Sequence, residues 1–189
     1  MVKDERRTLM IEEEANRAAA HQKSPDDFNR PTRWFLVALE KYFADKFTEF
    51  SVNTAICVFS TDDDFVAGGN MSKTHLAACQ TCSFLPEDTS TILLLIQMTQ
   101  KMFDCPHCLR DCLIHEFAHS LWHLRKLAKM DSASKRVAHL NRKFAPEEDH
   151  DNFWGECYSA VWRIWNSATT AYWAAQSSHP ELMLLAPAE

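Results

Sequence analysis

Two histidines and a glutamate beside the first of them form the part of the sequence best suited to chemistry. His115, Glu116 and His119 make up the pattern H-E-x-x-H. In a helix, residues at i and i+4 lie on one face, one turn apart, so both imidazoles can reach a single Zn²⁺ ion. The glutamate then lies beside the metal, where it can take a proton from a water molecule. The motif therefore predicts a zinc-dependent hydrolase, and in particular a peptidase.

The residues around the motif have the periodicity of an amphipathic helix. No Gly or Pro occurs between residues 108 and 131. At about 100° per residue the two histidines fall on the side opposite an apolar row, which consists of Leu113, Phe117, Leu121 and Leu124. We therefore predict a helix from Pro106 to Lys129, with its apolar side in the core and the ligands facing a cleft.

Three residues compete for the third ligand that a catalytic zinc site normally has. His123 lies one turn beyond His119, and a straight helix carries it about 6 Å further along the axis. We therefore predict that His123 is a surface residue or only a neighbour of the ligands. His150 stands among acidic residues that can orient its ring, and Glu156 follows it on the last predicted helix. The sequence favours His150 and leaves Glu156 as the alternative.

Length and composition predict a globular chain with one main domain. Of the 189 residues, 46% are hydrophobic and 24% are charged, and the net charge of −6 does not favour binding to nucleic acid or anionic lipid. The charged first 20 residues contain no signal sequence, and the longest apolar run, residues 91–98, is too short to cross a bilayer. We expect a cytoplasmic or nuclear protein that is not secreted and has no membrane partner. Its seven cysteines are then reduced thiols or metal ligands, and its oligomeric state is left open.

The order of elements along the chain predicts an α+β fold. Residues 1–30 read as a charged N-terminal helix and linker, residues 31–176 as the domain, and residues 177–189 as a tail. Helices are expected at 32–46, within 131–145, and from Asp149 or Asp151 to Gln176; strands are expected at 50–58, 65–69 and 91–98. The first of these helices has an expected apolar stripe of Trp34, Val37, Ala38, Phe43 and Phe47.

Four of the cysteines form two C-x-x-C pairs. Cys79 and Cys82 make the first, and Cys105 and Cys108 make the second, with 22 residues between the pairs. Such spacing fits a second, structural zinc ion bound by four thiolates. Unliganded thiols fit equally well, and a redox pair is a third interpretation. The sequence leaves these alternatives open.

The segment His150-Asp151-Asn152-Phe153-Trp154, together with the order of elements from residue 32 to 168, resembles the SprT-like and Spartan group of zincin metallopeptidases. In that group the third histidine opens a motif of the form H-G-x-x-F. The His-Asp form also resembles the related WLM peptidases. A weaker similarity, around Glu156, is to the gluzincins, whose last helix supplies a glutamate ligand. The resemblance implies a zincin-like fold, in which a small mixed sheet packs on the H-E-x-x-H helix and a second long helix.

The SprT-like resemblance also implies a cytosolic or nuclear protease that acts on a protein or peptide. Spartan-like relatives cleave proteins crosslinked to DNA, although the net charge of this chain does not favour nucleic acid as a partner. In this hypothesis Glu116 is the general base, and Tyr158 or His123 donates a hydrogen bond to the oxyanion. The strand at residues 92–98 is expected to pair with an extended substrate.

Two hypotheses from other classes remain. In the first, the protein is a non-catalytic protein-binding module, and zinc only stabilises its fold. Glu116→Gln then changes no measurable property of the protein. In the second, the cysteine pairs form a thiol-based redox sensor in which the histidines have no role.

Overall fold

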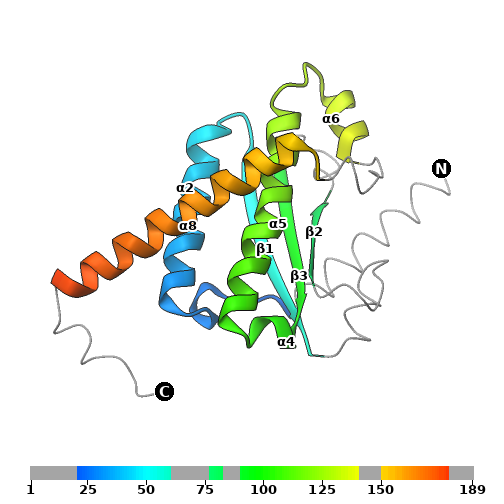
Figure 1. Cartoon of the computed structure of the whole chain (residues 1–189). Helices are drawn as coiled ribbons and strands as arrows, with labels where there is room; N and C mark the ends of the chain where they lie inside the picture. Colours follow the sequence, from blue (N-terminus) through cyan, green and yellow to red (C-terminus); the bar gives the residue numbers. More distant parts are fainter. Residues whose placement is uncertain (1–20, 61–76, 83–89, 141–149, 179–189) are drawn as a thin grey trace.

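The computed structural model describes residues 21–60, 77–82, 90–140 and 150–178, and Figure 1 shows their arrangement. A 3-10 turn, η1 (Pro25–Asp27), leads into helix α2 (Arg30–Lys46). The Asn29 side chain caps α2 by accepting a hydrogen bond of 3.0 Å from the backbone N–H of Thr32. The predicted N-terminal helix, the predicted strand at 65–69 and nearly all of the predicted tail lie outside the described residues.

The apolar face of α2 differs from the predicted stripe. Phe35, Leu39 and Phe43 are fully buried and form an i, i+4, i+8 row. Trp34 and Val37 of the predicted stripe are instead 43% and 64% exposed. The prediction was wrong for these two residues because two overlapping apolar rows exist, and the row with the larger buried phenylalanines faces the core.

The sheet contains strands β1 (Ser51–Phe59), β2 (Ala77–Cys82) and β3 (Thr91–Thr99) in the order β1-β3-β2. β1 pairs with β3 in parallel along its whole length, and β2 pairs with β3 in the antiparallel direction. The predicted small mixed sheet and the predicted strands at 50–58 and 91–98 are confirmed. β2 was not predicted, because its sequence Ala-Ala-Cys-Gln-Thr-Cys has no alternation of apolar and polar residues.

The position of β3 excludes one predicted role. β3 is the central strand, with hydrogen-bonded neighbours on both sides. A strand in that position has no free backbone edge, so the prediction that residues 92–98 pair with an extended substrate was wrong. Its apolar run reflects burial, since Ile92, Leu94, Ile96 and Met98 are all fully buried.

Among the described residues, four further helices follow β3: α4 (Gln100–Phe103), α5 (Pro106–Leu127), α6 (Ala133–Leu140) and α8 (Asn152–Ser178). α5 contacts β2, α2 contacts β1, and both helices contact α8. In Figure 1, α5 stands in front of the strands, and α8 crosses both α2 and α5. α5 is thus held between the sheet and α8. Within the described ranges, no helix is both long enough and apolar enough to span a bilayer.

Candidate metal centre

Helix α5 carries the H-E-x-x-H motif, and its two histidines face His150 and Trp154 at the start of α8. Cys105 is its N-cap residue, Pro106 occupies its first turn and the helix ends at Leu127, close to the predicted bounds. The predicted apolar side is confirmed, because the exposed fraction is 0% for Leu113, Phe117, Leu121 and Leu124. This burial fixes the rotation of α5 and keeps both motif histidines only partly buried.

Three histidines come together on this side of α5. The Nε2 atoms of His115 and His119 are 3.1 Å apart. His150, which directly precedes α8, brings its ring centroid to 5.3 Å from that of His115 and 4.8 Å from that of His119. One ligand atom from each histidine lies within 4.8 Å of the other two. The three imidazoles therefore form a group that could bind a metal ion.

The two helical imidazoles are held in their neutral form. Burial lowers the pKa of His119 from 6.5 to about 3, with smaller contributions from His115, His150 and His123. Burial, and secondly the charge of His150, also lowers the pKa of His115. Because both folded-state pKa values lie below the ordinary value, these rings carry a free nitrogen lone pair at neutral pH. Neutral imidazole is the form that binds metal ions.

Asp151 fixes the position of His150. Its Oδ1 accepts a hydrogen bond of 2.7 Å from the backbone N–H of Trp154, which caps α8. The same oxygen accepts a bond of 3.2 Å from Nε1 of Trp122, a buried residue of α5. Lys126 of α5 lies 3.9 Å from the other oxygen. Asp151 thus ties the first turn of α8 to α5 and places the preceding residue, His150, against the motif.

Asp151→Ala is expected to destabilise the protein by about 2–3 kcal/mol, because a helix cap is lost and the buried indole N–H of Trp122 loses its partner. Metal affinity should fall about 10–100-fold, as when a supporting residue of a ligand is removed. Urea unfolding and calorimetric zinc titration measure the two effects. Asp151→Asn keeps an acceptor oxygen and is the matched control. Equal zinc affinity in the Ala and Asn variants would contradict this role.

Trp154 forms an aromatic wall beside the histidines. Its ring centroid lies 4.5 Å from that of His150, 5.2 Å from His115 and 5.4 Å from His119. Tyr158 stacks on Trp154 at 5.1 Å. The indole Nε1–H of Trp154 is buried and, within the described part of the chain, donates a hydrogen bond to no acceptor. Trp154 therefore covers one side of the three imidazoles.

The two carboxylates singled out from the sequence have different surroundings. Glu116 is only 7% exposed and lies between His115 and His119 along α5. Glu156 is exposed on α8, in a shallow hollow that it shares with Arg125 and Arg163. Among the described residues, the group of possible ligands contains His150 and not Glu156. The geometry thus favours His150 as the third ligand.

His123 faces a different partner. Its Nδ1 lies 3.2 Å from Nε2 of His139, which α6 supplies. Burial, and secondly the charge of His139, lowers the pKa of His123 to about 4. His123 thus belongs to a second histidine pair rather than to the ligand group. His139 was not predicted, because a single histidine in a short polar helix gives no signal of its partner.

The His123 pair predicts a pH-dependent stability of the metal-free protein. Below the ordinary histidine pKa of 6.5 the unfolded chain takes up a proton, whereas folded His123 does so only near pH 4. The unfolded state binds more protons in this window, so stability is complete above pH 6.5 and falls as the pH is lowered. His123 should account for a loss of about 2 kcal/mol between pH 7 and pH 5.

Urea unfolding at pH 7 and pH 5 measures this loss. His123→Gln should reduce the difference in unfolding free energy between the two pH values by about 2 kcal/mol. His107→Gln, at an exposed position of α5, should leave the difference unchanged. The interpretation fails if His123→Gln retains the full pH dependence.

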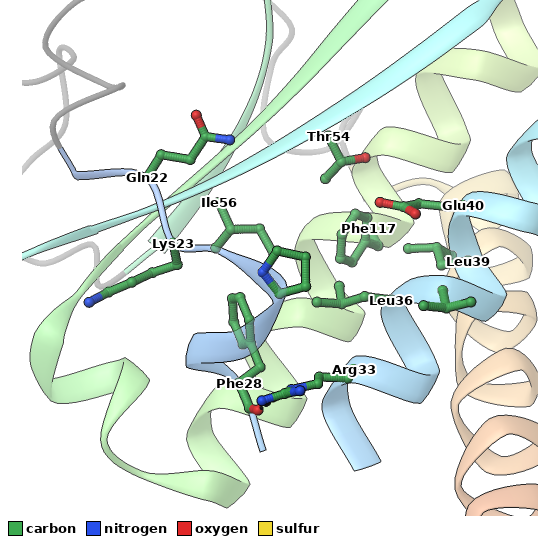
Figure 2. Close-up of a pocket in the computed structure, with 12 residues that line it drawn as sticks. Gln22, Lys23, Phe28, Arg33, Leu36, Leu39, Glu40, Thr54, Ile56 and Phe117 are labelled. Carbon is green, nitrogen blue, oxygen red and sulfur yellow. Dashed lines mark hydrogen bonds between the residues drawn. The ribbon is translucent and has the colours of Figure 1, made fainter. Parts of the chain in front are cut away.

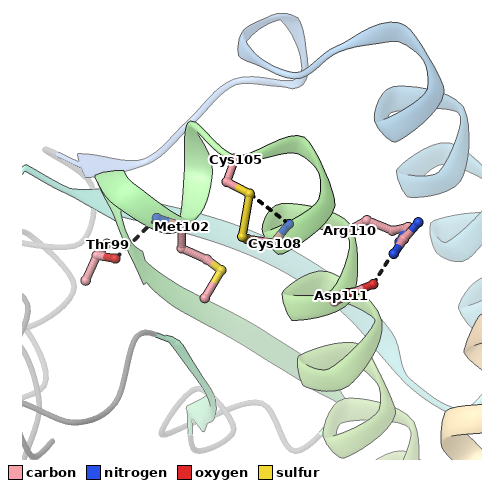
Figure 3. The surroundings of a disulfide bond; sticks show 6 residues. All are labelled: Thr99, Met102, Cys105, Cys108, Arg110 and Asp111. Atoms are coloured by element: carbon pink, nitrogen blue, oxygen red, sulfur yellow. Dashed lines mark hydrogen bonds and ion pairs between the residues drawn. A yellow bond between two sulfur atoms is a disulfide. The ribbon is translucent and has the colours of Figure 1, made fainter.

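The cysteine pairs do not form a four-thiolate site in this structure, which was one of the alternatives that the sequence left open. Cys105 and Cys108 are joined by a disulfide bond at the start of α5 (Figure 3). The backbone of Cys79 and Cys82 belongs to the extended strand β2, opposite Ile96 and Leu93, rather than to a metal-binding turn. The expectation of reduced or metal-bound thiols is thus corrected at the second pair, because the first turn of α5 brings those two sulfurs together.

A small hollow of about 110 Å³ lies elsewhere, between η1, α2 and β1 (Figure 2). Its walls include Phe28, Leu36, Ile56 and Phe117. Phe117 is on the buried side of α5, so this hollow opens toward the core side of the helix and not toward the histidines.

Comparison with protein-family models, with curated proteins and with solved structures gave no match. The function must therefore be inferred from the chemistry of the site. The features available for that inference are three converging imidazoles that are partly or fully exposed to solvent, and a buried carboxylate next to the first of them in the sequence.

Proposed function

We propose that this protein is a zinc-dependent metallopeptidase. The observation that carries the proposal is the convergence of His150 on the two histidines of the H-E-x-x-H helix. The sequence motif predicted two of these ligands from their spacing alone. His150 is 31 residues further along the chain than His119. Its position next to the two motif histidines is therefore independent support for a metal site.

The donor set suits zinc. Nitrogen atoms bound to one tetrahedral zinc ion at 2.0–2.1 Å are about 3.3 Å apart. The Nε2 atoms of His115 and His119 are already separated by 3.1 Å. Three imidazoles also match a known ligand set of catalytic zinc sites, which keep the fourth position open. Zinc bound here would act as a Lewis acid toward a carbonyl group and a water molecule.

Glu116 is the proposed general base. It follows His115 directly along α5 and is largely buried. A carboxylate in such a place can accept the proton of the attacking water and return it to the leaving amine. Because Glu116 is largely buried, bulk solvent competes little with the attacking water for hydrogen bonds to its carboxylate.

The surroundings of the histidines favour a substrate larger than a small molecule. His150 is exposed and the two other imidazoles are partly exposed. Among the described residues, Trp154 covers one side of the group, and the exposed surface of the imidazoles is available to a ligand. We propose that the substrate is a protein or peptide, consistent with the SprT-like resemblance. The acidic net charge does not support DNA as part of the substrate.

Removal of the metal tests the proposal. Purified protein should hydrolyse a dye-labelled unfolded protein such as casein, lose that activity on dialysis against a chelator and regain it with one equivalent of zinc. Circular dichroism should show the helices retained after dialysis. Failure of zinc to produce any hydrolysis of casein or of a mixed peptide library would count against the proposed activity.

A zinc-stapled binding module remains the second candidate. The possible ligands come from α5 and from the residue preceding α8, so a metal ion would crosslink two packed helices. This function predicts that the chelator unfolds the chain and that no hydrolysis occurs with zinc. The dialysis experiment therefore separates the two functions.

A further inference from the structure

The Cys105–Cys108 disulfide lies at the first turn of α5 (Figure 3). Cys105 is the N-cap residue and Cys108 is three residues later. His115 follows Cys108 by seven residues, or about 10 Å along the helix axis. The disulfide is thus a separate chemical feature on the helix that carries the proposed metal ligands.

The exposure of this disulfide differs from that of the thiols in the core. Cys108 and the two residues that precede it are exposed, and Cys105 is partly exposed. Cys57, Cys112 and Cys157, by contrast, are buried. A thiol reagent or a second protein can therefore reach the disulfide without unfolding the domain, whereas the buried thiols are protected.

The disulfide contributes little as a structural link. It joins residues only three apart in sequence, and the stabilisation from a disulfide falls as the closed loop becomes shorter. The same two residues are already held by the first turn of α5, through a hydrogen bond of 3.3 Å from the Cys108 backbone N–H to the Cys105 sulfur. Breaking the S–S bond therefore leaves the helix start capped.

The start of α5 also stabilises a cysteine thiolate. The first N–H groups of a helix have no partners within it and carry partial positive charge, which favours an anion at the N-cap. The Cys105 sulfur already accepts one of these N–H groups. Of the neighbouring acids, Asp104 accepts a hydrogen bond from Gln100 and Asp111 is paired with Arg110. A thiolate that is stabilised in this way is a good leaving group.

We propose that Cys105 and Cys108 form a redox-active pair that exchanges with a dithiol reductant. A thiolate of the reductant attacks the exposed sulfur of Cys108, the Cys105–Cys108 bond breaks, and Cys105 leaves as the thiolate at the helix N-terminus. The second thiol of the reductant then attacks the mixed disulfide and releases Cys108. The reductant is oxidised to a disulfide, and two electrons and two protons reduce the pair to two thiols.

This pair supplies an exchange activity that does not depend on the proposed hydrolysis. None of the three histidines, nor Glu116, takes part in it. A protein that lacks peptidase activity can still show the exchange, and a peptidase can lack it. The two proposals therefore fail separately.

Redox titration of the full-length protein tests the pair. The protein is equilibrated in buffers of graded reduced-to-oxidised glutathione ratio that contain a chelator, quenched, and alkylated before and after reduction with two mass-labelled reagents. Peptide mass spectrometry then reports each cysteine. We expect Cys105 and Cys108 to pass together from disulfide to thiols within the series, while Cys57 and Cys157 stay reduced throughout.

Two results would overturn the proposal. The first is a pair that stays reduced at every ratio, which would make Cys105 and Cys108 neighbouring thiols only. The second is a disulfide that persists in the largest excess of reduced glutathione under native conditions, which would make it a structural bond. Cys108→Ser serves as a control, because the variant cannot form this bond and should show at most a mixed disulfide of Cys105 with glutathione.

Discussion

Glu116→Gln is expected to lower the rate of casein hydrolysis by about 10²–10⁴-fold, the usual contribution of a general acid–base residue. The amide has nearly the same size as the carboxylate, so the largely buried side chain should be accommodated without a change of fold. It cannot accept the proton of the attacking water. The three histidines are untouched, so zinc affinity should remain close to that of the unaltered protein.

Glu156→Gln is the matched control for this experiment, since it makes the same chemical change at an exposed position of α8 outside the ligand group. It should retain full activity. Rates of casein hydrolysis and calorimetric zinc titrations of both variants are required. Full activity in Glu116→Gln would rule out the proposed mechanism, and equal loss in both variants would show that the effect is not specific to the base.

His150→Ala is expected to lower zinc affinity by more than about 100-fold, because loss of a ligand should exceed the 10–100-fold cost of losing a residue that only supports one. His150 is exposed, so its removal should not disturb the core. The remaining pair on α5 then holds the ion with two imidazoles only. Hydrolysis should fall with zinc occupancy and recover in part at high zinc concentration.

Two variants make this test specific to His150. His107→Ala removes an exposed histidine of α5 outside the ligand group, and Glu156→Ala removes the alternative ligand. Both should bind zinc with unchanged affinity in calorimetric titration. Loss of affinity in Glu156→Ala with none in His150→Ala would reverse the assignment and place this site closer to the gluzincin arrangement.

The parts of the fold that follow from local periodicity were predictable from the sequence. The bounds and the buried side of α5 follow from the spacing of Leu113, Phe117, Leu121 and Leu124, which only one rotation of a helix can bury together. The strands β1 and β3 follow from their β-branched and apolar residues. Placement of His150 near the motif was favoured by its acidic neighbours and its position before a helix, but not fixed by them.

The features that depend on contacts between distant elements were not predictable. The link from Asp151 to Trp122 and the pairing of His123 with His139 each join residues of different helices. Trp34 and Val37 were placed in the core because apolar residues of one helix can form two overlapping rows, and only the packing partner decides between them. The central position of β3 likewise depends on β2, whose sequence gives no strand signal.

X-ray absorption at the zinc edge of the purified, zinc-loaded protein tests the central claim most directly, since it reports the atoms bound to the metal. The proposed centre predicts one zinc ion per chain with only nitrogen or oxygen neighbours at about 2.0–2.1 Å, including the scattering pattern of imidazole rings. Sulfur neighbours at about 2.3 Å would place the metal at the cysteines instead. That result, or a chain that retains no zinc, would contradict a metal centre at His115, His119 and His150.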